Sequence, residues 1–254
     1  MRNEMSEMNS QEPIRINRFL AQCGLGARRK CDELIRSGHI LVNGKKVAEL
    51  GMKIRPDSDK VEYKGKALRP IKKLQYWAYF KPREVMVTSN DPQGRTTVYD
   101  ALKRDGLDAD ILKYVGRLDY NSEGLLLLTN DGGLIHALTH PRFQIKKVYL
   151  VRTGRAMGET EITQLIKGVE SEEQILHAAK VKQIEVKPGQ QWYEITLFEG
   201  KNRQIRRMLE AVGHDVRRLR RIQFATVRLG NMKTGTYREL TQREISGLKN
   251  AGYK

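Results

Sequence analysis

The chain has few cysteines and no long apolar run, and both shortages narrow the classes of protein it can belong to. Cys23 and Cys31 are the only cysteines in 254 residues, and their spacing fits neither a zinc-binding pattern nor a disulfide framework. The apolar run Leu125 to Leu128 is far shorter than the roughly 20 residues that cross a membrane. The first dozen residues lack an apolar signal segment. We therefore expect reduced thiols, no membrane partner and a cytoplasmic protein.

Aromatic and acidic residues are also scarce. Aromatic residues make up 7% of the chain, too few for a broad platform on which single-stranded bases stack. Asp and Glu number 30 against 47 Lys and Arg, which gives a net charge of +17 and a pI near 9.9. Such an excess predicts a polyanionic partner, because phosphate contacts release counterions. The basic residues are clustered, which favours nucleic acid over a uniformly solvated surface; the clusters are ARRK (27–30), RPIKK (69–73), RQIRR (203–207) and RRLRR (217–221).

The hydrophobic pattern divides the chain into a flexible tail at 1–13, a small domain at 14–68, a linker at 69–74 and a larger domain at 75–254. In the small domain we expect two short helices, then a hairpin at Asn43-Gly44, which accepts the positive φ angles of a type I′ turn, and a further strand. This α/β domain would bind RNA through basic residues on or beside its helices: Arg15, Arg18, Arg28, Arg29 and Lys30.

The larger domain alternates strand and helix patterns. Because several strands follow one another through short turns, we expect an α+β domain whose mixed, largely antiparallel sheet is flanked by helices. Strands are predicted at 74–80, 84–89, 113–119, 124–130, 146–154, 179–186 and 191–200, and helices at 96–103, 133–140, 159–169 and 203–213.

Asp119 is the first candidate for chemistry. In the predicted strand, Arg117 and Asp119 are two residues apart and so share a face, just before the run of leucines that must be buried. A carboxylate beside an apolar wall is costly unless something pairs with it. From this segment alone two interpretations stay open: Asp119 caps a turn, or it is held in place to react.

The helix predicted at 203–213 offers a partner for that carboxylate. Asn202 would cap it, and its apolar residues form one stripe. At 100° per residue, Arg203 and Arg207 fall opposite the stripe, toward solvent or RNA. Arg206 falls on the flank, where it can be partly buried and reach Asp119 as an ion-pair partner that keeps the acid ionised.

Two further constellations suggest other chemistry. Asp119 and Glu123 resemble the acid–base pair of a sugar hydrolase, but Glu123 follows a turn and is expected to remain solvated. His136 and His140 are four residues apart on a predicted helix and would suit a metal ion. No third ligand with matching spacing accompanies them. We therefore expect no metal, and a structural or RNA-facing role for both histidines.

Several stretches resemble known families. RINRFLAQCGLGARRKCDELIRSGHILVNGKKV resembles the RNA-binding domain named after ribosomal protein S4, although Ala27 stands where that family usually has a capping Ser and Cys31 where it has Ala. GRLDYNSEGLLLLTNDG, KKVYLV and EGKNRQIRRMLEAVG resemble, in order, the motifs of pseudouridine synthases of the RsuA type. YFKPREVMVTSNDPQGRTTVYDAL is similar to the B-type branch, which modifies large-subunit ribosomal RNA. Ser122 replaces a common Thr, and Lys201 a frequent Arg.

The resemblance implies an isomerase that converts a uridine of 23S ribosomal RNA to pseudouridine, without a cofactor. It implies that Asp119 is the catalytic acid residue, Arg206 its ion-pair partner, and Tyr149 the aromatic residue that packs on the target base. It also implies that Arg117 fills the gap left by the flipped uridine. The sequence leaves open whether Asp119 attacks the sugar or removes a sugar proton, and whether Tyr149 is instead a core tyrosine.

Two alternatives to this function remain. A non-catalytic RNA-binding factor for ribosome assembly would explain the charge and the small domain equally well. The same enzyme acting on small-subunit (16S) ribosomal RNA would carry the same motifs. A monomer is expected, since one chain carries all of them.

Overall fold

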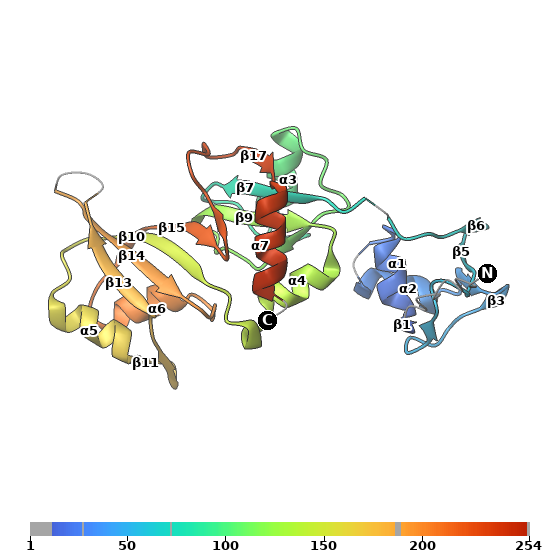
Figure 1. The fold of residues 1–254 in the computed structure, drawn as a ribbon, viewed down its shortest axis with the longest axis horizontal. Helices are drawn as coiled ribbons and strands as arrows, with labels where there is room; N and C mark the ends of the chain where they lie inside the picture. Colours follow the sequence, from blue (N-terminus) through green and yellow to red (C-terminus); the bar gives the residue numbers. More distant parts are fainter. Residues whose placement is uncertain (1–11, 27, 72, 186–188, 253–254) are drawn as a thin grey trace, which may run out of the picture. The chain divides into compact units, whose positions relative to one another are not determined.

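The computed structural model describes residues 12–26, 28–71, 73–185 and 189–252, and the chain forms two compact units divided between Leu74 and Gln75 (Figure 1). Most of the predicted tail at 1–13 and the missing cap at Ala27 lie outside the described residues. In the described part of the chain, no helix is both long enough and apolar enough to cross a membrane.

The first unit is a small α/β domain. Helices α1 (Ile16–Gln22) and α2 (Arg28–Arg36) bury Ile16, Phe19, Cys31 and Ile35 in a core shared with the strands. Asn43 and Gly44 adopt φ angles of 51° and 77° and connect the first two strands of the hairpin sheet, as the sequence predicts. A four-stranded sheet runs in the order β3 (Lys45–Lys46), β2 (Ile40–Val42), β5 (Val61–Tyr63) and β6 (Lys66–Ala67), and β1 (Ile14–Arg15) pairs with β4 (Lys53–Ile54).

The second unit is built on a mixed sheet of nine strands, which confirms the predicted α+β class. The main path of the sheet is β13 (Lys180–Ile184), β14 (Gln191–Leu197), β10 (Lys147–Thr153), β15 (Val216–Phe224), β9 (Glu123–Thr129), β7 (Tyr76–Lys81) and β17 (Tyr237–Glu239). Strand β8 (Lys113–Val115) pairs with β9, and β16 (Val227–Arg228) pairs with β15. A separate hairpin consists of β11 (Val169–Ser171) and β12 (Gln174–Leu176).

Two hydrophobic cores cover this sheet. One includes alternate residues of the leucine run, Leu126 and Leu128, and packs against α3 (Val98–Arg104), α5 (Glu159–Lys167) and α6 (Gln204–Ala211). The other includes Leu125 and Leu127 and packs against α4 (Gly132–Thr139) and α7 (Gln242–Gly252), which contact each other (Figure 1). Strand β9 is therefore buried on both faces, which explains why its sequence is a continuous apolar run.

The pairing of β9 with β15 joins the two halves of the sheet. It is parallel, with Glu123 opposite Arg220 and Gly124 opposite Arg221, whereas the other ladders of the sheet are antiparallel. The strands approach so closely that a Cβ atom at Gly124 would overlap the carbonyl group of Arg221 and lie 2.8 Å from its backbone nitrogen. Gly124 also has a φ of +108°, which side chains rarely adopt.

Glu123 is not solvated, contrary to the sequence-based expectation. Its side chain is buried and accepts hydrogen bonds from Arg218 Nε at 2.9 Å and from Arg220 Nε at 2.7 Å. Burial alone would raise the pKa of Glu123, but the two arginines outweigh burial and lower it. The turn before β9 was expected to leave Glu123 in water; instead the parallel partner strand supplies two cations at its side.

Lys81, the last residue of β7, is a fully buried cation beneath the turn that precedes β9. Its Nζ donates hydrogen bonds to the carbonyl oxygens of Pro82 at 2.8 Å and Ser122 at 2.9 Å. Burial lowers the pKa of Lys81 to about 7, although the carboxylates of Asp119 and Glu123 act to raise it. The residue therefore holds the turn in place at an electrostatic cost.

Several predicted elements differ from the structure. The strand expected at 113–119 ends at Val115, because Gly116 has a φ of +68°. The strand expected at 84–89 is reduced to a single bridge between Met86 and Thr97. The hairpin of β11 and β12, the strands β15, β16 and β17, and the C-terminal helix α7 were not predicted.

The close approach at Gly124 predicts a large loss of stability for Gly124→Ala. The added methyl group would meet backbone rather than a movable side chain, so the free energy of unfolding should fall by about 3 kcal/mol or more. Gly230→Ala is the control, because Gly230 also has a positive φ but lies in open space; it should cost only about 1 kcal/mol. Urea denaturation of both variants checks this, and equal losses would contradict it.

The buried Lys81 predicts a stability that depends on pH. Between its folded pKa of about 7 and its ordinary value of 10.5, the unfolded chain binds more protons at this residue than the folded chain does. Its contribution to stability therefore rises as the pH rises through this range. Relative to that of Lys81→Met, the free energy of unfolding of the wild-type protein should rise by up to about 1.4 kcal/mol per pH unit. Denaturation at pH 6, 7.5 and 9 measures the difference; a constant difference would show that Lys81 keeps its proton.

Candidate active site

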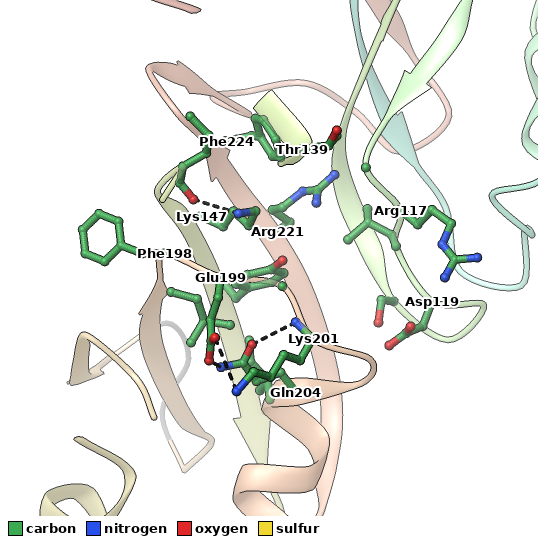
Figure 2. A pocket seen from close by; sticks show the side chains of 18 of the residues that line it. Arg117, Asp119, Thr139, Lys147, Phe198, Glu199, Lys201, Gln204, Arg221 and Phe224 are labelled. Carbon is green, nitrogen blue, oxygen red and sulfur yellow. Dashed lines mark hydrogen bonds and ion pairs between the residues drawn. The ribbon is translucent and has the colours of Figure 1, made fainter. Parts of the chain in front are cut away.

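A cavity of about 310 Å³ in the second unit brings together four of the site residues predicted from the sequence (Figure 2). Its lining comes from the segment after β8, the end of α4, strands β10 and β15, and the loop that leads into α6. Among the predicted site residues, it is lined by Arg117, Asp119, Tyr149 and Arg203.

Asp119 is the first residue of a tight turn between β8 and β9, and in Figure 2 its carboxylate points toward the cavity. The turn is held through its backbone carbonyl groups. The carbonyl oxygen of Asp119 accepts from the amide of Ser122 at 3.0 Å, and that of Tyr120 accepts from the amide of Glu84 at 2.7 Å. Lys81 binds the carbonyl of Ser122.

Arg206 provides the remaining anchor of the turn. Its Nη2 donates to the carbonyl oxygen of Asn121 and its Nη1 to that of Val216, both at 3.2 Å. All four carbonyl groups from 119 to 122 are therefore bound, by three different elements of the chain and by the turn itself.

Arg206 acts on Asp119 through charge rather than by a direct ion pair. Burial and the neighbouring Arg203 lower the pKa of Arg206, and the Asp119 carboxylate acts in the opposite direction. The described residues show no hydrogen-bonded ion pair between the two side chains. The sequence predicted an ion pair; instead, the guanidinium positions the turn that carries the acid.

Tyr149 lies on β10 and forms part of both the cavity wall and the adjoining hydrophobic core. Its backbone pairs with Arg221 of β15, which is fully buried and also lines the cavity. Lys147, two residues before Tyr149, lines the same cavity and donates to the carbonyl of Ile145 at 2.8 Å. Burial lowers the pKa of Lys147 to about 8, and the positive charge of Arg221 makes a smaller contribution in the same direction.

The helix predicted at 203–213 begins at Gln204, and Arg203 rather than Asn202 occupies its N-cap position, with a φ of +46°. The buried Gln204 side chain accepts from the amide of Lys201 at 3.1 Å and donates to Glu199 at 2.6 Å. These bonds fix the loop that forms one side of the cavity. Arg203 is exposed there, as is Arg117 on the opposite side.

Arg207 does not face solvent, so its predicted contact with RNA is wrong. Only 8% of the residue is exposed, and its Nη2 donates to the carbonyl oxygen of Ser171 at 2.6 Å. The hairpin of β11 and β12, which the sequence did not reveal, covers this face of α6 and accepts the arginine. The helical-wheel argument failed because it treated the face opposite the apolar stripe as open.

The cluster at 217–221 was also expected to hold phosphates, but in the structure most of its arginines have other roles. Arg218 and Arg220 bind Glu123, and Arg221 is buried in the cavity wall. Lys81, Lys147 and Arg221 were missed as site residues. Strand alternation could have found two of them, because Lys147 is two residues from Tyr149 and Arg221 is two residues from the apolar Leu219.

In the small unit, the side chains of Arg15, Arg18, Arg28, Arg29 and Lys30 are all exposed. Arg28 is oriented by hydrogen bonds to Asn17, which in turn donates to Asp32 at 2.8 Å. The rings of His136 and His140 lie 5.2 Å apart, and Nδ1 of His140 accepts from the amide of Arg142. No group of three or more His, Cys, Asp or Glu side chains able to hold a metal occurs among the described residues.

Comparison with known proteins identifies the family. Residues 75–211 match the RNA pseudouridylate synthase family, and residues 14–60 match the S4 domain. An uncharacterised RNA pseudouridine synthase of Aquifex aeolicus (strain VF5) is 37% identical over 92% of this chain and 93% of its own length. The ribosomal large subunit pseudouridine synthase B of Bacillus subtilis (strain 168) is also 37% identical, over 92% of this chain and 95% of its own length.

A crystal structure of a pseudouridylate synthase shares the fold, with a TM-score of 0.64 and 27% identity, and covers 92% of this chain and 99% of its own. The resemblance noted in the sequence is thus confirmed over both units. With the anchored turn, the cavity and the S4 domain in one chain, the protein belongs to the RNA pseudouridylate synthase family and is an RNA pseudouridine synthase of the RsuA and RluB type.

Proposed function

We propose that this enzyme converts a specific uridine of large-subunit (23S) ribosomal RNA to pseudouridine and that Asp119 is its catalytic residue. The observation that carries the proposal is the anchored turn, which presents one carboxylate to a cavity of about 310 Å³. The choice of large-subunit RNA rests on the Bacillus subtilis relative, whose name specifies that substrate. The enzyme would work as a cytoplasmic monomer during ribosome biogenesis.

The chemistry suits a positioned carboxylate. Isomerisation breaks the bond between C1′ and N1 of the uridine, turns the base and joins C1′ to C5, with loss of the C5 proton and gain of a proton at N1. Positive charge develops at C1′ as the glycosidic bond breaks, and an anion at Asp119 can stabilise it or trap it as an ester. The anchored carbonyl groups keep the carboxylate in place, so little reorganisation is needed when the charge develops.

The target nucleotide must leave its stack to reach the cavity. In this proposal Tyr149 packs on the flipped base, and Arg117 and Arg203, exposed at the cavity, contact the surrounding RNA. Arg206 is a positioning residue, because its hydrogen bonds go to the backbone of the turn. The S4 domain supplies additional affinity through its exposed cations.

The first test measures tritium release from ribosomal RNA labelled at uracil C5. The wild-type enzyme should release tritium from 23S RNA, and Asp119→Asn should lose at least about 10³-fold in rate, as expected for a group acting directly on the reacting bond. Asp110→Asn, at an exposed position, should retain the wild-type rate. Release from 16S RNA instead would identify small-subunit RNA as the substrate. Undiminished release by Asp119→Asn would exclude a catalytic role for Asp119.

A second test concerns the S4 domain. Replacing Arg15, Arg18 and Arg29 with Ala should weaken RNA binding and reduce the slope of log K against log salt concentration, by up to about 0.7–0.9 per lost phosphate contact. The matched control removes the same charge from the strand side of the domain by replacing Lys45, Lys64 and Lys66, which are also exposed. Filter binding at about 50 to 300 mM salt measures both slopes. Equal changes in the two variants would indicate non-specific attraction.

A further inference from the structure

Arg221 is a buried cation whose guanidinium is only partly bound. The residue is 2% exposed, and its Nε donates to the carbonyl oxygen of Leu125 at 2.8 Å. Its Nη2 is buried without a hydrogen-bond partner in the described part of the chain. Arg221 lines the cavity that also contains Asp119 (Figure 2). Buried donors are rarely left unmatched, so this atom calls for an explanation.

The surroundings of Arg221 lack a compensating carboxylate. Arg218 and Arg220 on the same strand share Glu123, whereas no acidic side chain of the described residues pairs with Arg221. Burial lowers the pKa of Arg221, and the phenol of Tyr149 beside it acts in the opposite direction. A buried charge without a counter-ion is among the more costly features of a folded protein. The cavity is thus prepared for an acceptor that carries negative charge.

The proposed reaction produces such an acceptor. When the bond between C1′ and N1 breaks, its electron pair remains with the base, and the negative charge is shared between N1 and the carbonyl oxygens O2 and O4. This holds whether Asp119 attacks C1′ or removes a sugar proton. The base then forms the bond from C5 to C1′, the proton on C5 passes to solvent, and N1 takes up a proton from solvent.

We propose that Arg221 donates a hydrogen bond from Nη2 to a carbonyl oxygen of the target uracil and stabilises the negative charge on the base when its bond to C1′ breaks. The proposal rests on the proposed function. A phosphate group fits this position less well, because Leu138, Ile145, Leu219 and Phe224 make the nearby wall apolar. A flat base with an apolar face and a carbonyl edge matches that wall, and phosphates can instead meet the exposed Arg117 and Arg203.

The test compares Arg221→Gln, Arg221→Lys and the control Arg238→Gln in the full chain. Gln keeps a donor that can reach the Leu125 carbonyl but removes the charge, and Lys keeps the charge. Arg238 pairs with Glu244 at 2.7 Å and does not line the cavity. Single-turnover tritium release is measured at saturating ribosomal RNA and divided by the folded fraction from circular dichroism, and the Kd for RNA is measured separately.

We expect Arg221→Gln to lose about 10²- to 10³-fold in rate, as for other donors that face developing charge. Its Kd for RNA should change by less than about threefold, because the interaction strengthens only as the bond breaks. Arg221→Lys should react about tenfold faster than Arg221→Gln but more slowly than wild type, and Arg238→Gln should match wild type.

Several results would overturn the proposal. These are a wild-type rate per folded molecule in Arg221→Gln, equal rates for the Lys and Gln variants, or a rate loss explained entirely by weaker RNA binding. If Arg221→Gln did not fold, a wild-type rate in Arg221→Lys would also overturn it. Absence of release by the wild-type enzyme would instead contradict the proposed function, so the two failures can be told apart.

Discussion

The close parallel approach of β9 and β15 determines how the rest of the second unit is arranged. Only a residue without a side chain fits at Gly124, where the backbone of Arg221 lies in contact. The register of this pair brings Glu123 beside Arg218 and Arg220 on one face. It also sets Arg221 against the cavity on the other face. Since Asp119 precedes β9 by only four residues, the position of the acid follows from the same register.

Several charged side chains in and beneath the wall of the cavity are buried or half-buried. Lys81 and Arg221 are buried, and Lys147 is half-buried; burial lowers the pKa of each. Acidic side chains offset part of this cost, through Asp119 and Glu123 for Lys81 and Glu199 for Lys147. A site with more positive than negative groups favours bound anions. The stability of the fold and the binding of an anion in the cavity therefore depend on the same residues.

Local patterns in the sequence predicted many of the elements but not β15, and contacts across the fold decided the roles of the charged residues. The leucine run, the Asn43-Gly44 turn and the stripe of α6 follow from residue type and periodicity, and each forms as expected. Arg207, Glu123 and Arg221 were misjudged because their partners come from β11, β15 and the cavity, far away in the sequence. A buried arginine and a solvated one look alike until the covering element is known. Resemblance to a family brought Asp119, Tyr149 and Arg206 together, which spacing alone could not do.

The anchoring of the turn through its backbone has a consequence for how the enzyme can change over evolution. In the described part of the chain, the hydrogen bonds that fix residues 119 to 122 all reach carbonyl oxygens, and the ring of Tyr120 also lies 5.8 Å from the guanidinium carbon of Arg95. The exposed side chain of Asn121 can therefore be exchanged without removing any of these hydrogen bonds. Tolerance to substitution at Asn121 and a fixed position for the carboxylate of Asp119 therefore coexist in one turn.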